Sequence, residues 1–247
     1  MILWYLYIIM FSKILLILVL LINSLIAEAI FQPQKPGLFI VDDFEDADLS
    51  QFPRWWGFDN IDLTVEPNNL KEFSHLGKRS IQLTGLQKNW YVGGCGTYFG
   101  IDVANYNSIK MLVRGYGLKS AVLIVELFDD DNNNFEIESH PDSADETLAD
   151  DKFIHTLKVD WTGWKVVIIP FNNFVDANLG IGDDLWNPYQ TDSSGGLLQM
   201  QLVLLAGDKE IKPRVRIDEI KIYNQGPMPV KKVMDDSDVG DEDDDFF

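Results

Sequence analysis

The chain has 247 residues, a length that suits one large all-β domain with terminal tails. Hydrophobic residues make up 46% of the sequence, so a full core can form without disulfides, and Cys95 is the only cysteine. The net charge of −19 argues against nucleic acid and against anionic membrane surfaces as partners, because both would repel the protein.

The first 29 residues have the layout of an export signal. Residues 14–26 form an apolar run of signal-peptide length, and Ala27-Glu28-Ala29 follows it as an A-x-A cleavage pattern. Cleavage there makes Ile30 the first residue of a secreted or periplasmic protein. An alternative stays open in which residues 1–26 form an uncleaved membrane anchor.

The rest of the chain divides into a linker, a folded domain and a tail. Residues 30–37 are rich in Pro and polar side chains and predict a short linker. The predicted domain covers residues 38–225, and residues 226–247 form a C-terminal tail with eight acidic residues between positions 235 and 247. We expect this tail to be disordered, because it has too little apolar surface to offset the entropy lost on ordering.

The predicted domain consists of short β-branched and aromatic runs separated by Gly, Asn, Asp and Pro, without an amphipathic helix longer than two turns. The predicted strands cover residues 38–41, 61–66, 80–83, 98–103, 108–114, 121–128, 135–138, 153–159, 165–169, 198–205 and 214–223. Strands without helices between them predict antiparallel sheets packed face to face. The expected fold is therefore an all-β, jelly-roll-like β-sandwich in a single domain.

Alternation of side chains predicts an inward and an outward face for the central strands. The strands over residues 108–114, 121–128 and 198–205 each combine one apolar face with one mixed face. Four polar residues interrupt the mixed faces: Arg114, Glu126, Gln199 and Gln201. A mixed outer face is typical of a strand that is half covered or that lines a groove.

Two local patterns have structural interpretations. In the Trp161-x-x-Trp164 pair, we expect Trp164 to begin an inward-facing strand and to anchor the core. Residues 129–134 read DDDNNN and resemble half of a calcium loop, but Asn134 and His140 stand where an EF-hand needs Gly and Glu. We interpret this run as a hairpin turn between the two predicted strands that flank it.

Four segments follow one another in the predicted domain: VDDFED at residues 41–46, GKRSIQL at 77–83, WTGWKVVIIPFNNF at 161–174 and IDEIKIY at 217–223. Their succession resembles the galactose-binding-like β-sandwich, and within it the family 11 carbohydrate-binding modules and the relatives of the complex I intermediate-associated protein. The resemblance implies a non-catalytic protein that binds a polysaccharide or another glycan. It does not specify the glycan, because this superfold hosts many functions.

Sugar recognition needs flat apolar faces that pack on C–H surfaces and planar polar groups that pair with hydroxyls. The mixed strand faces supply polar groups, and residues 171–196, a long segment without predicted strands, supply aromatic rings. We expect a glycan groove formed by Arg114, Glu126, Trp186, Tyr189, Gln199 and Gln201. An alternative stays open in which the loop aromatics only cap the ends of the sandwich.

The resemblance also implies a structural calcium site. In the resembling folds, a calcium ion often ties the first strand to the last, and the acidic residues available for this here are Asp43, Glu45 and Asp218. Hard oxygen ligands in an acidic exported protein suit that ion.

The sequence shows no catalytic constellation. His75, His140 and His155 are scattered, and neither G-x-S-x-G nor H-E-x-x-H occurs. We therefore expect a binding protein and not an enzyme. The alternative function is a structural or assembly protein of the cell envelope or flagellar sheath, which would self-associate through the same sandwich.

Overall fold

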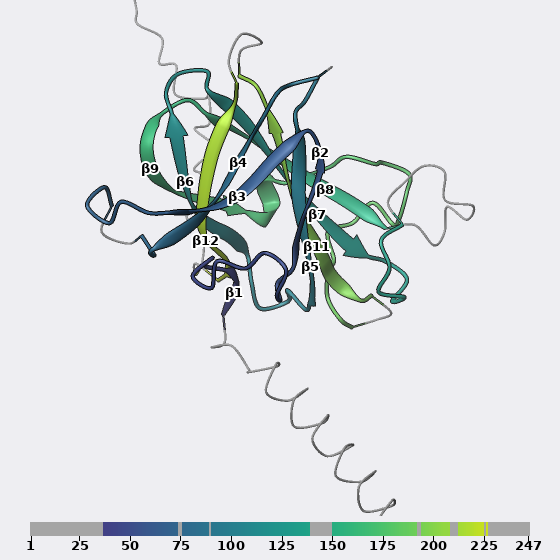
Figure 1. The fold of residues 1–247 in the computed structure, drawn as a ribbon. Coiled ribbons are helices and arrows are strands. Elements are labelled where there is room, and N and C mark those ends of the chain that lie inside the picture. The colour runs from purple at the N-terminus through teal and green to yellow at the C-terminus, as the bar shows by residue number, and fades with distance from the viewer. Residues whose placement is uncertain are drawn as a thin grey trace, which may run out of the picture.

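The computed structural model describes residues 37–73, 76–88, 90–138, 150–191, 194–207, 212–224 and 226. Within them, two six-stranded sheets with antiparallel pairing pack face to face (Figure 1), and this confirms the predicted all-β sandwich. The export signal and the acidic run of the tail lie outside the described residues, as does the linker before Gly37. Among the residues described, no helix is long and apolar enough to cross a membrane.

Sheet A contains β1 (Leu38–Asp42), β3 (Ile61–Pro67), β4 (Arg79–Gly85), β6 (Ser108–Tyr116), β9 (Thr162–Pro170) and β12 (Arg214–Tyr223). The strand order is β3-β4-β12-β6-β9. The first strand, β1, pairs with the second half of the last strand, β12, while β4 pairs with its first half. The two ends of the domain are therefore hydrogen-bonded to each other.

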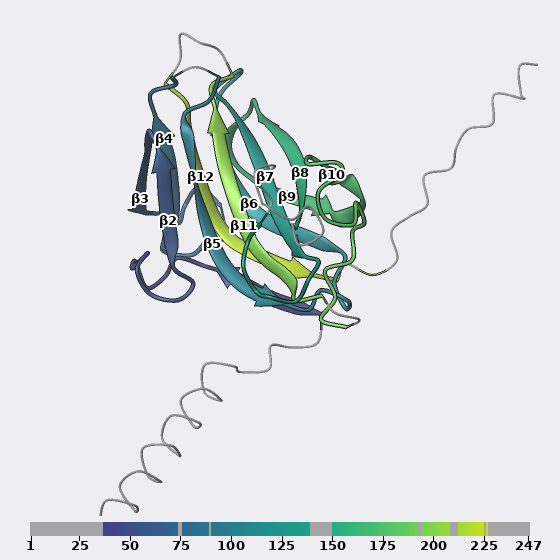
Figure 2. The same cartoon turned by 90° about the vertical axis from the view of Figure 1, so that its right-hand side faces the viewer.

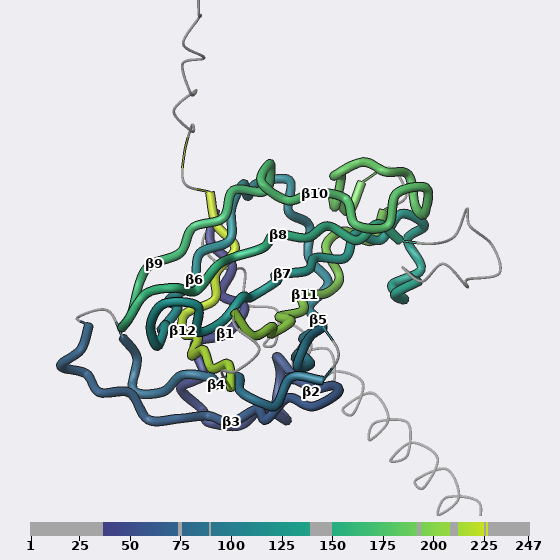
Figure 3. Tube along the Cα trace, turned by 90° about the horizontal axis from the view of Figure 1, so that it is seen from above, coloured from purple at the N-terminus to yellow at the C-terminus, as the bar shows by residue number. Residues whose placement is uncertain are grey.

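Sheet B contains β2 (Trp55–Asp59), β5 (Gly93–Ile101), β7 (Ala121–Asp130), β8 (Asp151–Val159), β10 (Val175–Asp176) and β11 (Gly196–Leu205). Its order is β10-β8-β7-β11-β5-β2. Figure 2 views the molecule from the side of this sheet, and Figure 3 shows the two sheets from above as adjacent layers.

The core lies between the sheets and is built from alternate residues of each strand. Its members from the central strands β6 and β7 are Ile109, Met111, Val113, Ala121, Leu123, Val125 and Leu127. Each of these side chains is at most 2% exposed. Burial of one such aliphatic side chain stabilises the fold by about 1.5–3 kcal/mol, so these positions fix which face of each strand looks outward.

The expected hairpin at residues 129–134 is wrong, as is the expected strand at 135–138. Asp129 and Asp130 are the last residues of β7, and β7 pairs with β8 instead. The carboxylate of Asp130 accepts hydrogen bonds from the backbone N–H groups of Asn133 and Phe135, at 2.7 and 2.9 Å. This side chain folds the following residues into a loop, since it satisfies amides that a strand partner would otherwise bind.

Strand β12 changes face within its length. Val215 and Ile217 point into the core, and simple alternation would place Glu219 beside them. The register with β6 shifts after Asp218, and Glu219 adopts a left-handed φ of 50°. Because a bulge adds one residue and reverses the alternation, Ile220 returns to the core.

Trp164 does not anchor the core between the sheets, so that expectation is wrong. The core residues of β9 include Ile169, which places Trp164 on the opposite, outer face. Its register partner in β6 is Arg114, and the guanidinium carbon of Arg216 lies 5.8 Å from its ring centroid. The indole is nonetheless only 9% exposed, so it packs on the outside of sheet A.

The segment after β9 is part of the packed structure. It begins with the 3₁₀ turn η2 (Phe171–Asn173), and the short strand β10 then pairs with β8. Further along, Trp186 and Tyr189 pack against the core. Aromatic anchors of this kind explain how so long a segment without extended strands stays on the domain.

Candidate functional site

The outer face of sheet B brings three of the expected site residues together. Gln201 of β11 lies opposite Glu126 of β7 in the pairing register, and Gln199 follows on the same face, opposite Phe128. On its other side, β11 pairs with β5, where Gln201 lies opposite Gly96 and Gln199 opposite Tyr98. Glu126, Gln199 and Gln201 therefore form a polar patch on two central, rigidly paired strands.

Aromatic side chains continue this patch toward the edge of the sheet. Trp56 of β2 is the register partner of Gly96, and Phe58 is the partner of Gly94. A Cβ atom on Gly96 would lie 2.7 Å from Cζ2 of Trp56 and 3.1 Å from Cγ of Gln201. The missing side chain at Gly96 thus lets the indole lie over β5 and approach Gln201.

We call the six residues that share this surface the sheet B face: Trp56, Phe58, Tyr98, Glu126, Gln199 and Gln201. Tyr98 is 36% exposed, and its hydroxyl donates a hydrogen bond to the carbonyl oxygen of Phe135 at 3.0 Å. Its ring is therefore held in place at the edge of the polar patch.

The polar groups of the sheet B face keep their hydrogen-bonding capacity. Within the described part of the chain, the side chains of Glu126, Gln199 and Gln201 make no hydrogen bond or salt bridge, although Gln199 is only 7% exposed. Burial raises the pKa of Glu126, while the charge of nearby Lys152 lowers it. Polar groups that are partly withdrawn from water and unpaired favour a ligand that can pair with them.

Arg114 belongs to a different surface. It lies on the outer face of sheet A, where its Nε and Nη2 atoms donate to Glu72 at 3.0 and 3.1 Å. Its guanidinium also stacks over the ring of Tyr116, at 4.7 Å. The sequence therefore predicted one groove from residues that lie on opposite sides of the sandwich, and Arg114 already has its partners.

Replacing Arg114 by Ala should lower the free energy of unfolding by about 1 kcal/mol, because the pair with Glu72 is bidentate but partly exposed. Urea denaturation of the two proteins would measure this difference. The Glu72→Ala protein should lose a similar amount, and the double variant little more than either. Fully additive losses would contradict an interaction between the two side chains.

The long segment does not place its aromatics on the sheet B face. The ring centroid of Trp186 lies 5.1 Å from that of Phe153, 4.8 Å from that of Phe171 and 6.3 Å from that of Phe174. Tyr189 is also packed against the core. This geometry matches the alternative in which these aromatics cap the end of the sandwich.

The three acidic residues expected to hold calcium do not gather their carboxylates. Glu45 and Asp218 flank Gly77, and Asp218 accepts hydrogen bonds from Nδ2 of Asn68 at 3.0 Å and from the backbone of Gly77 at 3.3 Å. Burial raises the pKa of Asp218 to about 7. Among the described acidic residues that cluster within 4.8 Å of one another, Asp43, Glu45 and Asp218 do not form a group.

The sequence predicted no strand for the part of the sheet B face that lies on β2. Trp56 and Phe58 lie in a short strand interrupted by Gly57, and its glycine and the preceding Pro53 made it look like a loop. One signal of this strand was present in the sequence. Trp56 and Phe58 are two residues apart, as are Gly94 and Gly96, which become their partners. Two rings at alternate positions of one strand need a neighbouring strand whose outer face is bare.

Comparisons with known proteins give distant structural neighbours. No protein-family model matches the sequence, and no curated protein matches it. A family 11 carbohydrate-binding module from Clostridium thermocellum, in complex with a β-1,3-1,4-mixed-linked tetrasaccharide, is 15% identical, with 77% of this chain and 98% of that chain covered at a TM-score of 0.46.

Two further neighbours have comparable scores. The CBM22-1 xylan-binding domain of Paenibacillus barcinonensis Xyn10C is 16% identical, covering 76% of this chain and 96% of that chain at a TM-score of 0.42. TmCBM61 in complex with β-1,4-galactotriose is 14% identical, covering 78% and 97% at a TM-score of 0.39. At such values the likeness is distant, and the site described above rests on the residues of this chain alone.

Proposed function

We propose that this protein binds carbohydrate, without catalysis, through the sheet B face. The observation that carries the proposal is that the side chains of Glu126, Gln199 and Gln201 are unpaired among the described residues, and that Gln201 lies beside the Trp56 ring. A merely solvated strand face would carry mostly Lys and Glu, whose heads reach into water. Neutral amides next to flat rings suit a ligand with both hydroxyls and C–H surfaces.

The register places part of the sheet B face in a row that runs across the strands. Glu126, Gln201 and Gly96, which Trp56 covers, are successive partners on β7, β11 and β5. With β2 added, the row crosses three interstrand spacings of about 4.8 Å each, or about 14 Å. A length of that order suits an oligosaccharide segment of a longer chain better than a free monosaccharide.

Each group has a defined role in such a complex. The amides of Gln199 and Gln201 and the carboxylate of Glu126 pair with hydroxyls, since an amide offers both donors and an acceptor. The rings of Trp56 and Tyr98 pack on the C–H faces of sugar units. The proposal assigns no reacting group, because glycosidases use two facing carboxylates and Glu126 is the only one on the face as defined.

Export, as proposed from the N-terminal segment, would bring this face to glycans outside the cytoplasm. The net charge of −19 is compatible with neutral polysaccharides, which exert no electrostatic repulsion on an acidic protein.

Calorimetric titration of the full chain with soluble β-glucans and related neutral polysaccharides tests the proposal. Trp56→Ala should weaken binding of the recognised glycan by about 1–3 kcal/mol, or about 5–150-fold, because a stacking ring is lost. Gln201→Ala should weaken it by about 0.5–1.5 kcal/mol through lost hydrogen bonds. Thermal unfolding of each variant separates lost affinity from lost folding.

Arg114→Ala is the matched control, because it removes a polar residue from the opposite face of the sandwich and should leave glycan affinity unchanged. Equal binding by the wild type, Trp56→Ala and Gln201→Ala would move the site elsewhere. Absence of any glycan binding, together with concentration-dependent oligomers in size-exclusion chromatography, would favour the alternative of an envelope or sheath assembly protein.

A further inference from the structure

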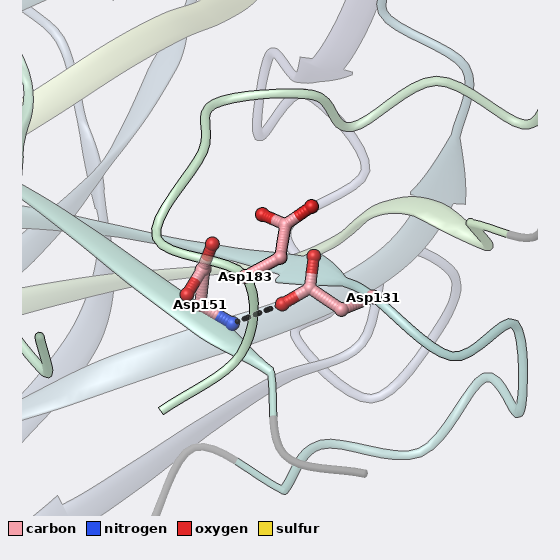
Figure 4. A group of neighbouring side chains, drawn as sticks. All are labelled: Asp131, Asp151 and Asp183. Carbon is pink, nitrogen blue, oxygen red and sulfur yellow. Dashed lines mark hydrogen bonds between the residues drawn. The ribbon is translucent and has the colours of Figure 1, made fainter. Parts of the chain in front are cut away.

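Aspartates gather where β7 ends and β8 begins, beside the long segment that precedes β11. Asp131 follows β7, Asp151 opens β8, and Asp183 lies in the long segment. Their ligand oxygens lie within 4.8 Å of one another (Figure 4). Asp129 lies beside this cluster, because it is the direct register partner of Asp151, and both residues are 0% exposed.

Two other buried aspartates nearby show what a purely structural role looks like. Both carboxylate oxygens of Asp130 accept backbone N–H groups of the loop after β7, among them Asn133 and Phe135. Both oxygens of Asp150 do the same, with Asp131 and Glu138 as donors at 3.4 and 2.8 Å. Loop formation therefore accounts fully for Asp130 and Asp150.

The cluster around Asp131 differs because three of its side-chain oxygens have no partner, although both oxygens of Asp151 accept backbone N–H groups, from Asp184 and Leu185. Asp129 Oδ1, Asp131 Oδ1 and Asn187 Oδ1 are each buried without a hydrogen-bond partner in the described structure. The other polar atom of each side chain is held: Asp129 Oδ2 by the backbone of Asn187, Asp131 Oδ2 by that of Asp151, and Asn187 Nδ2 by Asp183. A buried acceptor without a partner is costly, and three in one place indicate a missing ligand.

Within the described residues, no salt bridge compensates the charges of the cluster. The salt bridges between described residues involve Glu72, Asp62 and Glu219, and none of these belongs to the cluster. Asp129 and Asp151 lie directly opposite each other on the paired strands β7 and β8. Like charges directly opposite each other on paired strands are destabilising, so a cation between them would relieve the repulsion.

The cluster opens onto a cavity large enough for an ion. Its volume is about 130 Å³, and its lining includes Asp131, Asp183 and Asn187, with Tyr189 at one side. A side chain at Gly182 would collide with the carboxylates of Asp131 and Asp151, and this glycine has a left-handed φ of 80°. The backbone of the long segment can therefore pass close to the carboxylates only because residue 182 is Gly.

We propose that Asp129, Asp131, Asp151, Asp183 and Asn187 bind a divalent cation with calcium-like preferences. All five offer hard oxygen atoms, and their existing hydrogen bonds already orient them as the outer partners of metal ligands do. Carboxylate and amide oxygens in an irregular arrangement suit Ca²⁺, whereas Mg²⁺ demands near-ideal octahedral geometry and retains its waters. This site is separate from the calcium site that the sequence predicted at Asp43, Glu45 and Asp218. The proposal does not depend on glycan binding.

Such an ion would fasten the long segment to the ends of β7 and β8. Asp183 and Asn187 belong to the segment, and Trp186, between them, inserts among core aromatics. Binding that requires the folded arrangement stabilises it by mass action. Removal of the ion should therefore loosen residues 177–191 first.

The experiment uses the full chain, freed of metal with EDTA and then titrated with CaCl₂, MgCl₂ or TbCl₃. We expect about one Ca²⁺ per chain at this site, weaker binding of Mg²⁺, and Tb³⁺ luminescence excited through the neighbouring Tyr189 and Trp186. Asp183→Asn, which changes an exposed ligand, should lower Ca²⁺ affinity by at least about tenfold. Ca²⁺ should also raise the thermal midpoint of the wild type and protect residues 177–191 from proteolysis.

Asp160→Asn is the charge-matched control on an exposed turn, and Glu45→Gln probes the other acidic group. Both should bind Ca²⁺ as the wild type does at this site. Asp131→Asn repeats the test from a second element, so that a folding defect in one variant does not decide the result. Unchanged Ca²⁺ affinity in both Asp183→Asn and Asp131→Asn, or Mg²⁺ binding as tight as that of Ca²⁺, would overturn the proposal.

Discussion

Replacing Trp186 by Ala is expected to lower the free energy of unfolding by about 3 kcal/mol, the largest stability change that we foresee for a single side chain. The indole is surrounded by Phe153, Phe171 and Phe174, with centroid distances between 4.8 and 6.3 Å. Its removal would leave a cavity at the end of the core and detach the long segment. Urea denaturation should show a lower midpoint with an unchanged slope.

Trp90→Ala is the matched control for this prediction. Trp90 is 63% exposed and contacts Tyr91 at a centroid distance of 4.3 Å, so its loss should change the free energy of unfolding by less than about 1 kcal/mol. Similar destabilisation by both substitutions would show that Trp186 is not a core anchor. If the Trp186→Ala protein stayed stable but lost most of its glycan binding, Trp186 would belong to the binding site, as the sequence predicted.

Replacing Gly96 by Val should reduce glycan affinity by about 2–4 kcal/mol, or about 30–1000-fold, the largest binding effect that the site predicts. The new side chain would occupy the space now filled by the Trp56 ring and by Cγ of Gln201. The stacking platform and the hydrogen-bonding amide would both be displaced, so their losses combine. Titration calorimetry with the glycan that binds the wild type measures the change.

Gly57→Ala controls for the addition of a side chain to the same pair of strands. Gly57 lies on β2 opposite Cys95, and a Cβ atom there would meet mainly the Cγ2 atom of Ile61, at 3.0 Å. This variant should keep wild-type affinity. If Gly96→Val bound glycan as the wild type does, while folding normally, the sheet B face could not be the binding surface.

Alternation along the sequence predicted the facing of β6 and β7, because the pleat of a strand is a local property. It could not predict sheet membership, which depends on partners far away in the chain. Arg114 and Glu126 interrupt similar apolar patterns, yet β6 belongs to sheet A and β7 to sheet B. A groove that combined them was therefore wrong, although the polar positions on β7 and β11 do share one face.

The remaining errors also come from non-local structure. The bulge after Asp218 reverses the alternation in β12, and nothing in the run IDEIKIY marks it. The residues DDDNNN resemble a hairpin turn, but Asp129 stays in β7 because its register partner, Asp151, is supplied by a segment that follows a long connection. The acidic cluster was only partly visible: the run DDDNNN resembled half of a calcium loop, but the other members come from the start of β8 and from the long segment.

The position of Cys95 makes the rate of its thiol modification a measure of how often sheet B opens at β5. Cys95 is 0% exposed on β5 of sheet B, and burial raises the pKa of its thiol, so a thiol reagent cannot reach a reactive sulfur in the native state. Because the chain has no other cysteine, the rate of modification reports a single event, the exposure of β5. Cys95 also lies between Gly94 and Gly96, with its side chain on the opposite side of the strand from the sheet B face. A ligand bound to the sheet B face would stabilise the closed sheet and so lower the rate of Cys95 modification, although it does not contact the sulfur. The kinetics of thiol modification would then report ligand binding.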